Sequence, residues 1–322
     1  MSQVPCHIFS SFSPDGLTVV PKGRNNDVRS GEFGSYREKV VLKRYPQNRS
    51  ERFSREIVFL EHCERLGISS VPGLVEVCLN HLVIVLKGRA GLRPEIFSED
   101  HETQIIDFLL ALQQETSQQT NIPESIEATW NTNDFTKSLL WRREVLQKDV
   151  QQGKVASKDV DSFEVFERYL MSGLFRNDLK WLGHAIDQTS SVPGRDLRFI
   201  SPSDLGAHNC LEHDGRLSFL DFEYAGTDSG INLAGDLAMQ PDSLWASGDR
   251  HRIGARVVHE VFESDSYDSD RVERLFGTRW SLVALLRRTR ASEQIDEDGN
   301  DVRKFPSPNY IEEVADCIEG KI

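Results

Sequence analysis

Three oxygen-bearing side chains in the second half of the chain have the types and spacing that can hold a divalent cation. Asp204 and Asn209 stand in SPSDLGAHN at 201–209 with D-x-x-x-x-N spacing, and Asp221 follows an apolar strand in FLDFEYAG at 219–226. A hard cation such as Mg²⁺ prefers oxygen ligands, and substrate phosphates complete its octahedron. D-x-x-x-x-N alone is more typical of ordinary turn residues, but the addition of Asp221 favours a metal site.

A lysine in the first part of the chain could handle the phosphates. Lys43 ends the run KVVLK at 39–43, in which apolar side chains alternate around it. Such a lysine can hold the α- and β-phosphates of a nucleotide, with Glu56 on the following predicted helix as its ion-pair partner. Phosphoryl transfer also needs a metal and a base that orients the attacking hydroxyl. Simpler interpretations stay open, because a lysine at a strand end is usually solvated and Glu56 also stands four residues after Arg52.

The elements that must position these residues follow from the hydrophobic periodicity. The first ninety residues alternate short β-type runs with turn residues, which predicts an antiparallel sheet. Its strands are expected at 17–21, 39–45, 74–79 and 81–86, the last two as a hairpin separated only by Asn80. Between them, apolar residues recur with helical spacing from 50 to 67, and this predicts one amphipathic helix that ends at Gly67.

Beyond residue 98 the pattern becomes mostly helical. Helical periodicity extends over Ile105 to Leu112 and recurs around 134–150, 161–186, 250–263 and 271–290. One β-rich island covers 197–204 and 209–226, with His213-Asp214-Gly215 as a hairpin turn, and the acid-rich runs 264–270 and 293–301 are expected as solvated loops. We therefore predict a β-rich lobe at 1–88 and a helical lobe at 89–322.

Composition excludes several classes of protein. The 322 residues are 38% hydrophobic and 28% charged with a net charge of −13, which fits a globular chain and disfavours nucleic acid or anionic membranes as partners. The five cysteines form no C-x-x-C pair, so we expect small core residues in a reducing cytoplasm rather than zinc ligands or disulfides. Hydrolase motifs such as G-x-S-x-G and H-E-x-x-H are absent, as is any apolar stretch long enough for a membrane span.

The order of these residues resembles the aminoglycoside phosphotransferase and choline kinase family over nearly the whole chain. GRNND at 23–27 is similar to the phosphate-covering loop of that family, and would contribute Gly23 and Asn26. LDFEYAG at 220–226, followed by Asp236-Leu237-Ala238, resembles the segment that carries a metal-binding and a structural aspartate. The resemblance implies an α+β fold of the two-lobed protein-kinase-like type that binds ATP and Mg²⁺.

The resemblance also implies a role for each motif residue. Asp204 would be the catalytic base, Asn209 and Asp221 would bind magnesium, and Lys43 with Glu56 would position the phosphates of ATP. Glu223, two residues beyond Asp221, is a secondary candidate for contact with a cationic substrate or a second metal, and the alternative is an outward strand residue. The acceptor would be a small-molecule hydroxyl on an aminoglycoside, a choline-like amino alcohol, a sugar or an amino acid, and the sequence does not indicate an oligomeric state.

Two departures from the family pattern keep other functions open. Pro202 stands where the family usually has a His two residues before the catalytic aspartate, and the glycine loop offers only Gly23, Gly31 and Gly34 instead of a full G-x-G-x-x-G. A nucleotide-binding pseudokinase that senses or scaffolds is therefore the second hypothesis, and a helical binding protein with an accidental motif is the third. His208 is expected to pack under its turn and Trp280 to lie in the core.

Overall fold

The computed structural model describes residues 8, 18–19, 26–33, 38–114, 122–191, 193, 198–241, 243–292 and 309–320. The chain divides into two compact units. The sheet unit joins Met1–Pro94 with Thr103–Ile126 and Ile200–Thr227, and the helical unit comprises Glu95–Glu102, Glu127–Phe199 and Asp228–Ile322. Two segments from the later part of the chain thus belong with the N-terminal sheet. The lobe boundaries at 1–88 and 89–322 stay a prediction.

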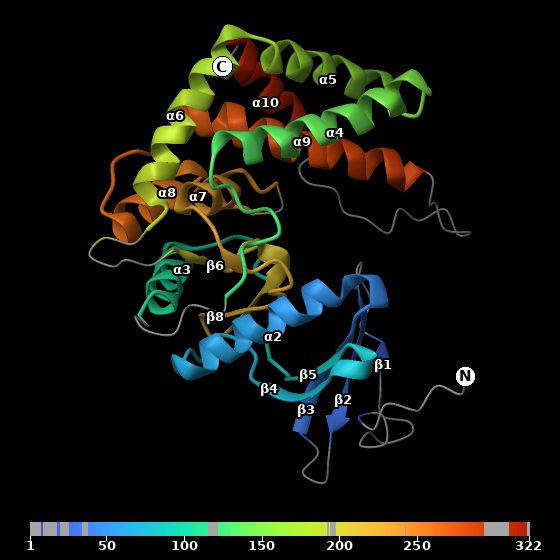
Figure 1. Cartoon of the computed structure of the whole chain (residues 1–322), viewed down its shortest axis with the longest axis vertical. Coiled ribbons are helices and arrows are strands. Elements are labelled where there is room, and N and C mark those ends of the chain that lie inside the picture. Colours follow the sequence, from blue (N-terminus) through green and yellow to red (C-terminus); the bar gives the residue numbers. More distant parts are fainter. Residues whose placement is uncertain are drawn as a thin grey trace. The chain divides into compact units, whose positions relative to one another are not determined.

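A five-stranded antiparallel sheet forms the first part of the sheet unit (Figure 1). Its strands are β1 (Thr18–Val19), β2 (Asp27–Phe33), β3 (Glu38–Arg44), β4 (Leu74–Cys78) and β5 (Val83–Lys87), in the order β1-β2-β3-β5-β4. The predicted antiparallel sheet is confirmed. The β4–β5 hairpin has a longer loop than the single predicted Asn80, because a 3-10 turn, η2 (Leu79–His81), precedes Leu82 in the left-handed region at φ 51°.

The position of Lys43 along β3 determines which face of the sheet its side chain lies on. Successive side chains of a strand face opposite sides of the sheet, so Val40 and Leu42 share one face. That face is apolar and includes Ile8, Cys78, Val83 and Val85. Lys43, paired in register with Val28 and Ile84, belongs to the other face. The lysine is therefore directed away from the apolar cluster and toward the helix that follows the strand.

That helix, α2 (Ser50–Arg65), confirms the amphipathic helix predicted over 50–67. A short 3-10 turn, η1 (Gln47–Arg49), leads into it, and Gly67 beyond its end adopts φ 68°. Two buried polar residues on α2 hold later segments of the sheet unit. Arg55 donates to the carbonyl oxygens of Glu124 and Ala225, and His62 Nε2 donates to the carbonyl of Leu112, 3.1 Å away. These bonds explain why the later segments join the sheet unit.

The segment that carries the candidate site packs on the same helix through aromatic rings. Phe222 stacks on Phe59 of α2 with ring centroids 4.6 Å apart. Phe108, on helix α3 (Glu99–Leu112), stacks on Phe219 at 4.4 Å. Because Phe222 is the residue after Asp221, this packing fixes the backbone next to the predicted metal ligand.

The predicted β-rich island consists of two small sheets. The strand β6 (Ile200–Ser201) pairs with β9 (Gly226–Thr227), and β7 (Cys210–His213) pairs with β8 (Arg216–Phe219), after the 3-10 turn η4 (Ala207–Asn209). Asp214 and Gly215, with φ of 50° and 72°, form the two-residue turn between paired His213 and Arg216. Two positive φ values are the signature of a type I′ turn, so the predicted hairpin is confirmed.

The helical unit contains most of the predicted helices (Figure 1). Its helices are α4 (Thr132–Gln151), α5 (Ser157–Leu170), α6 (Gly173–Thr189), α7 (Gly230–Met239), α8 (His251–Arg256), α9 (Ser269–Ser292) and α10 (Tyr310–Glu319). The single helix expected over 161–186 is instead two, because Ser172 caps a new helix by accepting from the N–H of Phe175. The pattern at 250–263 is α8 continued by a π-helical turn, η5 (Val257–Val261).

The acid-rich runs, the cysteines and the search for a membrane span are the three further predictions that concern the fold. The acid-rich run 264–270 is a loop up to Asp268 and enters α9 at Ser269. The run 293–301 lies outside the described residues. Cys63, Cys78 and Cys210 are buried and unbridged, as expected of core residues, whereas Cys317 is unbridged but only half-buried and Cys6 lies outside the described residues. No helix in the described ranges combines the length and the apolar composition that crossing a membrane requires.

Candidate active site

Lys43 is the centre of a buried charge cluster within the sheet unit. Its Nζ lies 2.7 Å from Glu56 Oε2 of α2, contacts Asp221 Oδ1 directly, and lies 3.9 Å from Glu223 Oε2. The ion pair predicted between Lys43 and Glu56 is present, whereas Arg52 pairs with Glu223 at 3.0 Å instead. One ammonium thus joins a strand, a helix and the DFE segment at 221–223.

Electrostatics keep this lysine protonated. Burial lowers the pKa of Lys43, but Glu56, Asp221 and Glu223 outweigh burial and raise the pKa above its ordinary value. For Glu56, burial has the opposite effect and raises the pKa of the carboxyl, against the influence of the Lys43 ammonium. The hydroxyl of Tyr45 donates to the same carboxylate. The cluster therefore holds a protonated ammonium in a fixed position between carboxylates, and an ammonium is a donor that phosphate oxygens accept from.

Removing that charge is expected to destabilise the fold. Lys43→Met leaves Glu56 buried without its cation, and breaking a buried ion pair in this way costs about 3–5 kcal/mol. Urea unfolding of Lys43→Met measures the loss, with the exposed Lys39→Met on the same strand as the matched control. The double variant Lys43→Met/Glu56→Gln is expected to recover most of the lost stability, and a double variant as unstable as Lys43→Met would contradict the ion-pair explanation.

Two residues of the site have backbones in the left-handed region. Asp221 has φ 63° and Ser203, immediately before Asp204, has φ 67°. Non-glycine residues rarely adopt this conformation, and such strain concentrates at functional sites. The Asp221 side chain is 43% exposed although it contacts Lys43, so its carboxylate is accessible to a ligand.

The Asp204 loop is held by its own hydrogen bonds. Asn209 Nδ2 donates to the carbonyl of Asp204 at 3.0 Å, and His208 Nε2 lies 3.1 Å from Asp204 Oδ2. The carbonyl of Asn209 accepts from the N–H of Leu220 at 2.8 Å, which aligns this loop with the residue before Asp221. The structure thus brings together the two stretches that carry Asp204, Asn209 and Asp221.

Glu223 lies inside the sheet unit. It is 1% exposed, accepts from Asn26 Nδ2 at 2.7 Å, and pairs with Arg52, whose guanidinium lies 4.5 Å from the ring centroid of Tyr224. The alternative of an outward strand residue is therefore wrong, and contact with substrate or a second metal stays a prediction. Asn26, by its bond to Glu223, belongs to the cluster, while Gly23 and Gly34 lie outside the described residues.

The chemistry of the donor set fits Mg²⁺ and phosphate. Asp221 supplies an accessible carboxylate and Asn209 an amide, both oxygen donors of the kind that Mg²⁺ takes together with waters and substrate phosphates. Within the described ranges, no three His, Cys, Asp or Glu side chains meet as a cluster that could hold a metal by themselves. Asn209 and Asp221 would therefore hold the ion together with phosphate oxygens and water.

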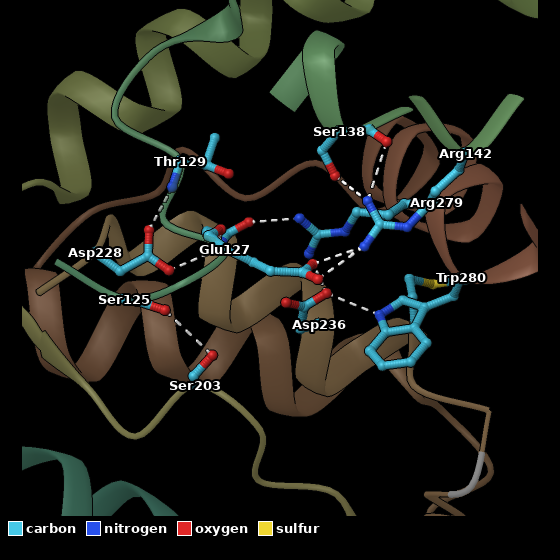
Figure 2. Close-up of polar contacts among 12 residues, drawn as sticks. Ser125, Glu127, Thr129, Ser138, Arg142, Ser203, Asp228, Asp236, Arg279 and Trp280 are labelled. Atoms are coloured by element: carbon cyan, nitrogen blue, oxygen red, sulfur yellow. Dashed lines mark hydrogen bonds and ion pairs between the residues drawn. The ribbon is translucent and has the colours of Figure 1, made fainter. Parts of the chain in front are cut away.

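Asp236, to which the family resemblance gives a structural role, lies in the helical unit (Figure 2). Its Oδ1 accepts from Arg279 and, at 2.8 Å, from Trp280 Nε1. Arg279 also donates to Asn232 at 2.8 Å and is buried between elements α7 and α9. Trp280, which is predicted to lie in the core, is half-buried, and its indole N–H donates to Asp236.

Asp228, also in the helical unit, is a buried carboxylate (Figure 2). It accepts from the N–H groups of Thr129 and Ser229 and from Asn232 Nδ2, at 2.8, 2.7 and 2.7 Å. Burial raises the pKa of Asp228 to about 7, although these donors oppose the shift. The bonds tie the segment before α4 to the start of α7.

The raised pKa of Asp228 predicts a pH dependence of stability. The native state holds the proton more tightly than the unfolded chain, so this group stabilises the fold fully below about pH 4 and loses that contribution as the pH rises to about 7. We expect the free energy of unfolding of the wild type to fall relative to that of Asp228→Asn across this window. Denaturant titrations at several pH values measure the difference, and parallel curves for the two proteins would contradict the assignment.

Three contacts of the site, made by His208, Tyr45 and Asn26, are not among those predicted from the sequence. His208, which the sequence predicts to pack under its turn, also contacts Asp204, and the local signal for this contact is that the two polar residues stand four positions apart on one short loop. Tyr45 shares the face of Lys43 because it stands two residues beyond it. The bond of Asn26 to Glu223 joins residues 197 positions apart, and no local pattern indicates it.

Comparison with known proteins supports the fold. No family model matches the sequence, and no curated protein matches it. Solved structures do match the chain. An ADP-bound aminoglycoside phosphotransferase is similar at 15% identity and TM-score 0.57, and the alignment covers 97% of each chain. A choline kinase from Cryptosporidium parvum Iowa II is similar at 11% identity and TM-score 0.53, and the alignment covers 97% of this chain and 89% of that one. An ethanolamine kinase from Plasmodium vivax matches at 13% identity and TM-score 0.51, covering 100% and 86%. The chain thus has the two-lobed α+β fold of kinase-like phosphotransferases, and the predicted fold class is confirmed.

Proposed function

We propose that this chain is an ATP- and Mg²⁺-dependent phosphotransferase that transfers the γ-phosphoryl group to a hydroxyl of a small molecule. The observation that carries the proposal is the cluster in which Lys43 contacts Glu56 and Asp221. A buried ammonium braced by carboxylates, next to an accessible carboxylate, is what a metal-bound triphosphate requires. The likeness of the fold to an ADP-bound aminoglycoside phosphotransferase supports this assignment.

Each residue would have a distinct role in the transfer. Lys43 would hold the phosphates while Glu56 keeps its ammonium in place, and Asn209 and Asp221 would hold Mg²⁺. The metal would neutralise charge that develops on the phosphoryl oxygens. Asp204, whose side chain is 31% exposed, would accept a hydrogen bond from the acceptor hydroxyl and take its proton as the new O–P bond forms.

The nucleotide loop completes the proposed site. Asn26, immediately before β2, is bonded to Glu223, which in turn pairs with Arg52 of α2. We assign Asn26 and Gly23 to the loop that covers the phosphates. Glu223 would then act by fixing this loop against α2, and any contact with a cationic acceptor would add to that role.

A screen of acceptors tests the proposed function. Purified chain is incubated with Mg²⁺-ATP and with aminoglycosides, choline, ethanolamine, sugars or hydroxyl amino acids, and ADP release and phosphorylated products are measured. We expect at least one acceptor to raise ADP release in Mg²⁺ and to gain a phosphoryl group, with no product in EDTA. Absence of any phosphorylated acceptor, together with unchanged ADP release, would contradict a phosphotransferase.

A pseudokinase is the second candidate, and Pro202 favours it. The family's usual His at this position is replaced by a side chain that offers no hydrogen-bond donor. A pseudokinase would bind ATP, as a rise in Tm with added nucleotide, without phosphoryl transfer to any acceptor. The acceptor screen and a thermal shift with Mg²⁺-ATP therefore separate the two functions.

A further inference from the structure

We propose that His208 is the positioning residue of Asp204, and that its ring N–H orients the carboxylate that receives the proton of the acceptor. His208 Nε2 lies 3.1 Å from Asp204 Oδ2. A carboxylate can only accept, so the ring nitrogen donates and carries the hydrogen. This role rests on the proposed function, because it concerns the same carboxylate and the same transfer.

The geometry of the loop presents His208 to Asp204. The turn η4 (Ala207–Asn209) begins after Gly206, and the N–H of Asn209 donates to the carbonyl of Gly206 at 2.8 Å. Leu205 and Ala207, on either side of Gly206, are buried and anchor the loop in the sheet unit. Asn209 Nδ2, on the same turn, donates to the carbonyl of Asp204 at 3.0 Å, which holds the turn close to Asp204 and leaves His208 Nε2 3.1 Å from its carboxylate.

The backbone before Asp204 is held by a different contact. The N–H of Ser203 donates to Ser201 Oγ at 3.0 Å, and this bond maintains the left-handed φ of 67° at Ser203. Ser201 lies in β6, so the backbone of the loop is fixed by the strand. Pro202 has no N–H that could donate to the side chain of Asp204. The ring N–H of His208 donates to this carboxylate, 3.1 Å away.

Exposure of the pair separates it from the buried lysine cluster. The side chains of His208 and Asp204 are 32% and 31% exposed, so both are accessible to an acceptor, whereas Lys43 and Glu56 are buried. An aspartate at a solvent-accessible position samples several rotamers unless a neighbour restrains it. The hydrogen bond from His208 restricts this freedom and keeps the reacting oxygen in the direction of the acceptor.

Three variants test this inference. His208→Phe keeps a ring of similar size without a donor, His208→Gln places an amide N–H near the position of Nε2, and His213→Phe on the exposed hairpin is the matched control. With the acceptor found in the screen, or with water as acceptor, we expect His208→Phe to lower kcat about tenfold or more. The Kd for ATP and the Tm should stay close to those of the wild type, and His208→Gln should recover most of the lost kcat.

The results separate the inference from the proposed function. A wild type that transfers no phosphoryl group overturns the proposed function, and with it the role of His208, before any variant is compared. An active wild type whose kcat is unchanged in His208→Phe overturns the inference alone. The same conclusion follows if His208→Gln is as impaired as His208→Phe, or if kcat falls only in step with the Tm or with affinity for ATP.

Discussion

Replacing Asp204 with asparagine is expected to lower turnover by about 10²- to 10⁴-fold, the range that general-base catalysis contributes. Asparagine keeps the size of the side chain and one oxygen that can accept from His208, but it cannot take a proton from the acceptor hydroxyl. Binding of ATP should be preserved, because Lys43 and Asp221, which hold the phosphates and metal in our proposal, are unchanged. The measurement is kcat by ADP release, with the Kd for ATP from calorimetry.

The hairpin supplies a control for this substitution. Asp214 is an exposed acid of the same unit, in the turn between β7 and β8, so Asp214→Asn removes an equal charge without touching the site. We expect Asp214→Asn to retain wild-type turnover. Equal turnover of Asp204→Asn and the wild type on the identified acceptor would remove Asp204 from the role of base.

Asp221→Asn is expected to weaken the binding of magnesium and to lower turnover. A metal that stabilises the transferred group contributes several kcal/mol, so turnover should fall roughly 10²- to 10³-fold. Stability should change less than in Lys43→Met, because Glu56 and Glu223 still surround the Lys43 ammonium. Titration of turnover with Mg²⁺ measures the effect, and the midpoint should move to higher Mg²⁺ concentration.

Asp214→Asn again serves as the control for the loss of one negative charge. Its Mg²⁺ titration should coincide with that of the wild type. If Asp221→Asn also gives an unchanged midpoint and unchanged turnover, the metal assignment of this residue is wrong.

Local patterns in the sequence predict the elements around the site well. The β-branched run at 39–45 predicts β3, and helical spacing in 50–67 predicts α2, which carries Glu56 as the expected partner of Lys43. The two-residue turn at Asp214-Gly215 follows from the demand for positive φ. These features depend on neighbours within a few residues, which is why the sequence alone reveals them.

Other features depend on partners that lie far along the chain. The strand β2 is polar and contains Gly31, so its place in the sheet comes from pairing with β3 rather than from its own pattern. Glu223 is buried because Asn26 and Arg52, 197 and 171 positions away, satisfy its carboxylate. Neither outcome follows from local propensity, because long-range pairing decides both.

A crystal structure with Mn²⁺ and a nonhydrolysable ATP analogue would show whether the Lys43 cluster binds a metal-bound triphosphate, since the anomalous signal of Mn²⁺ locates the metal without reference to the nucleotide. We expect a metal peak beside the Asp221 carboxylate and the Asn209 amide oxygen, with Lys43 Nζ on a phosphate oxygen and Glu56 still paired to the lysine. A metal held by other residues, or a triphosphate bound away from Lys43, would show that these residues do not form the nucleotide site.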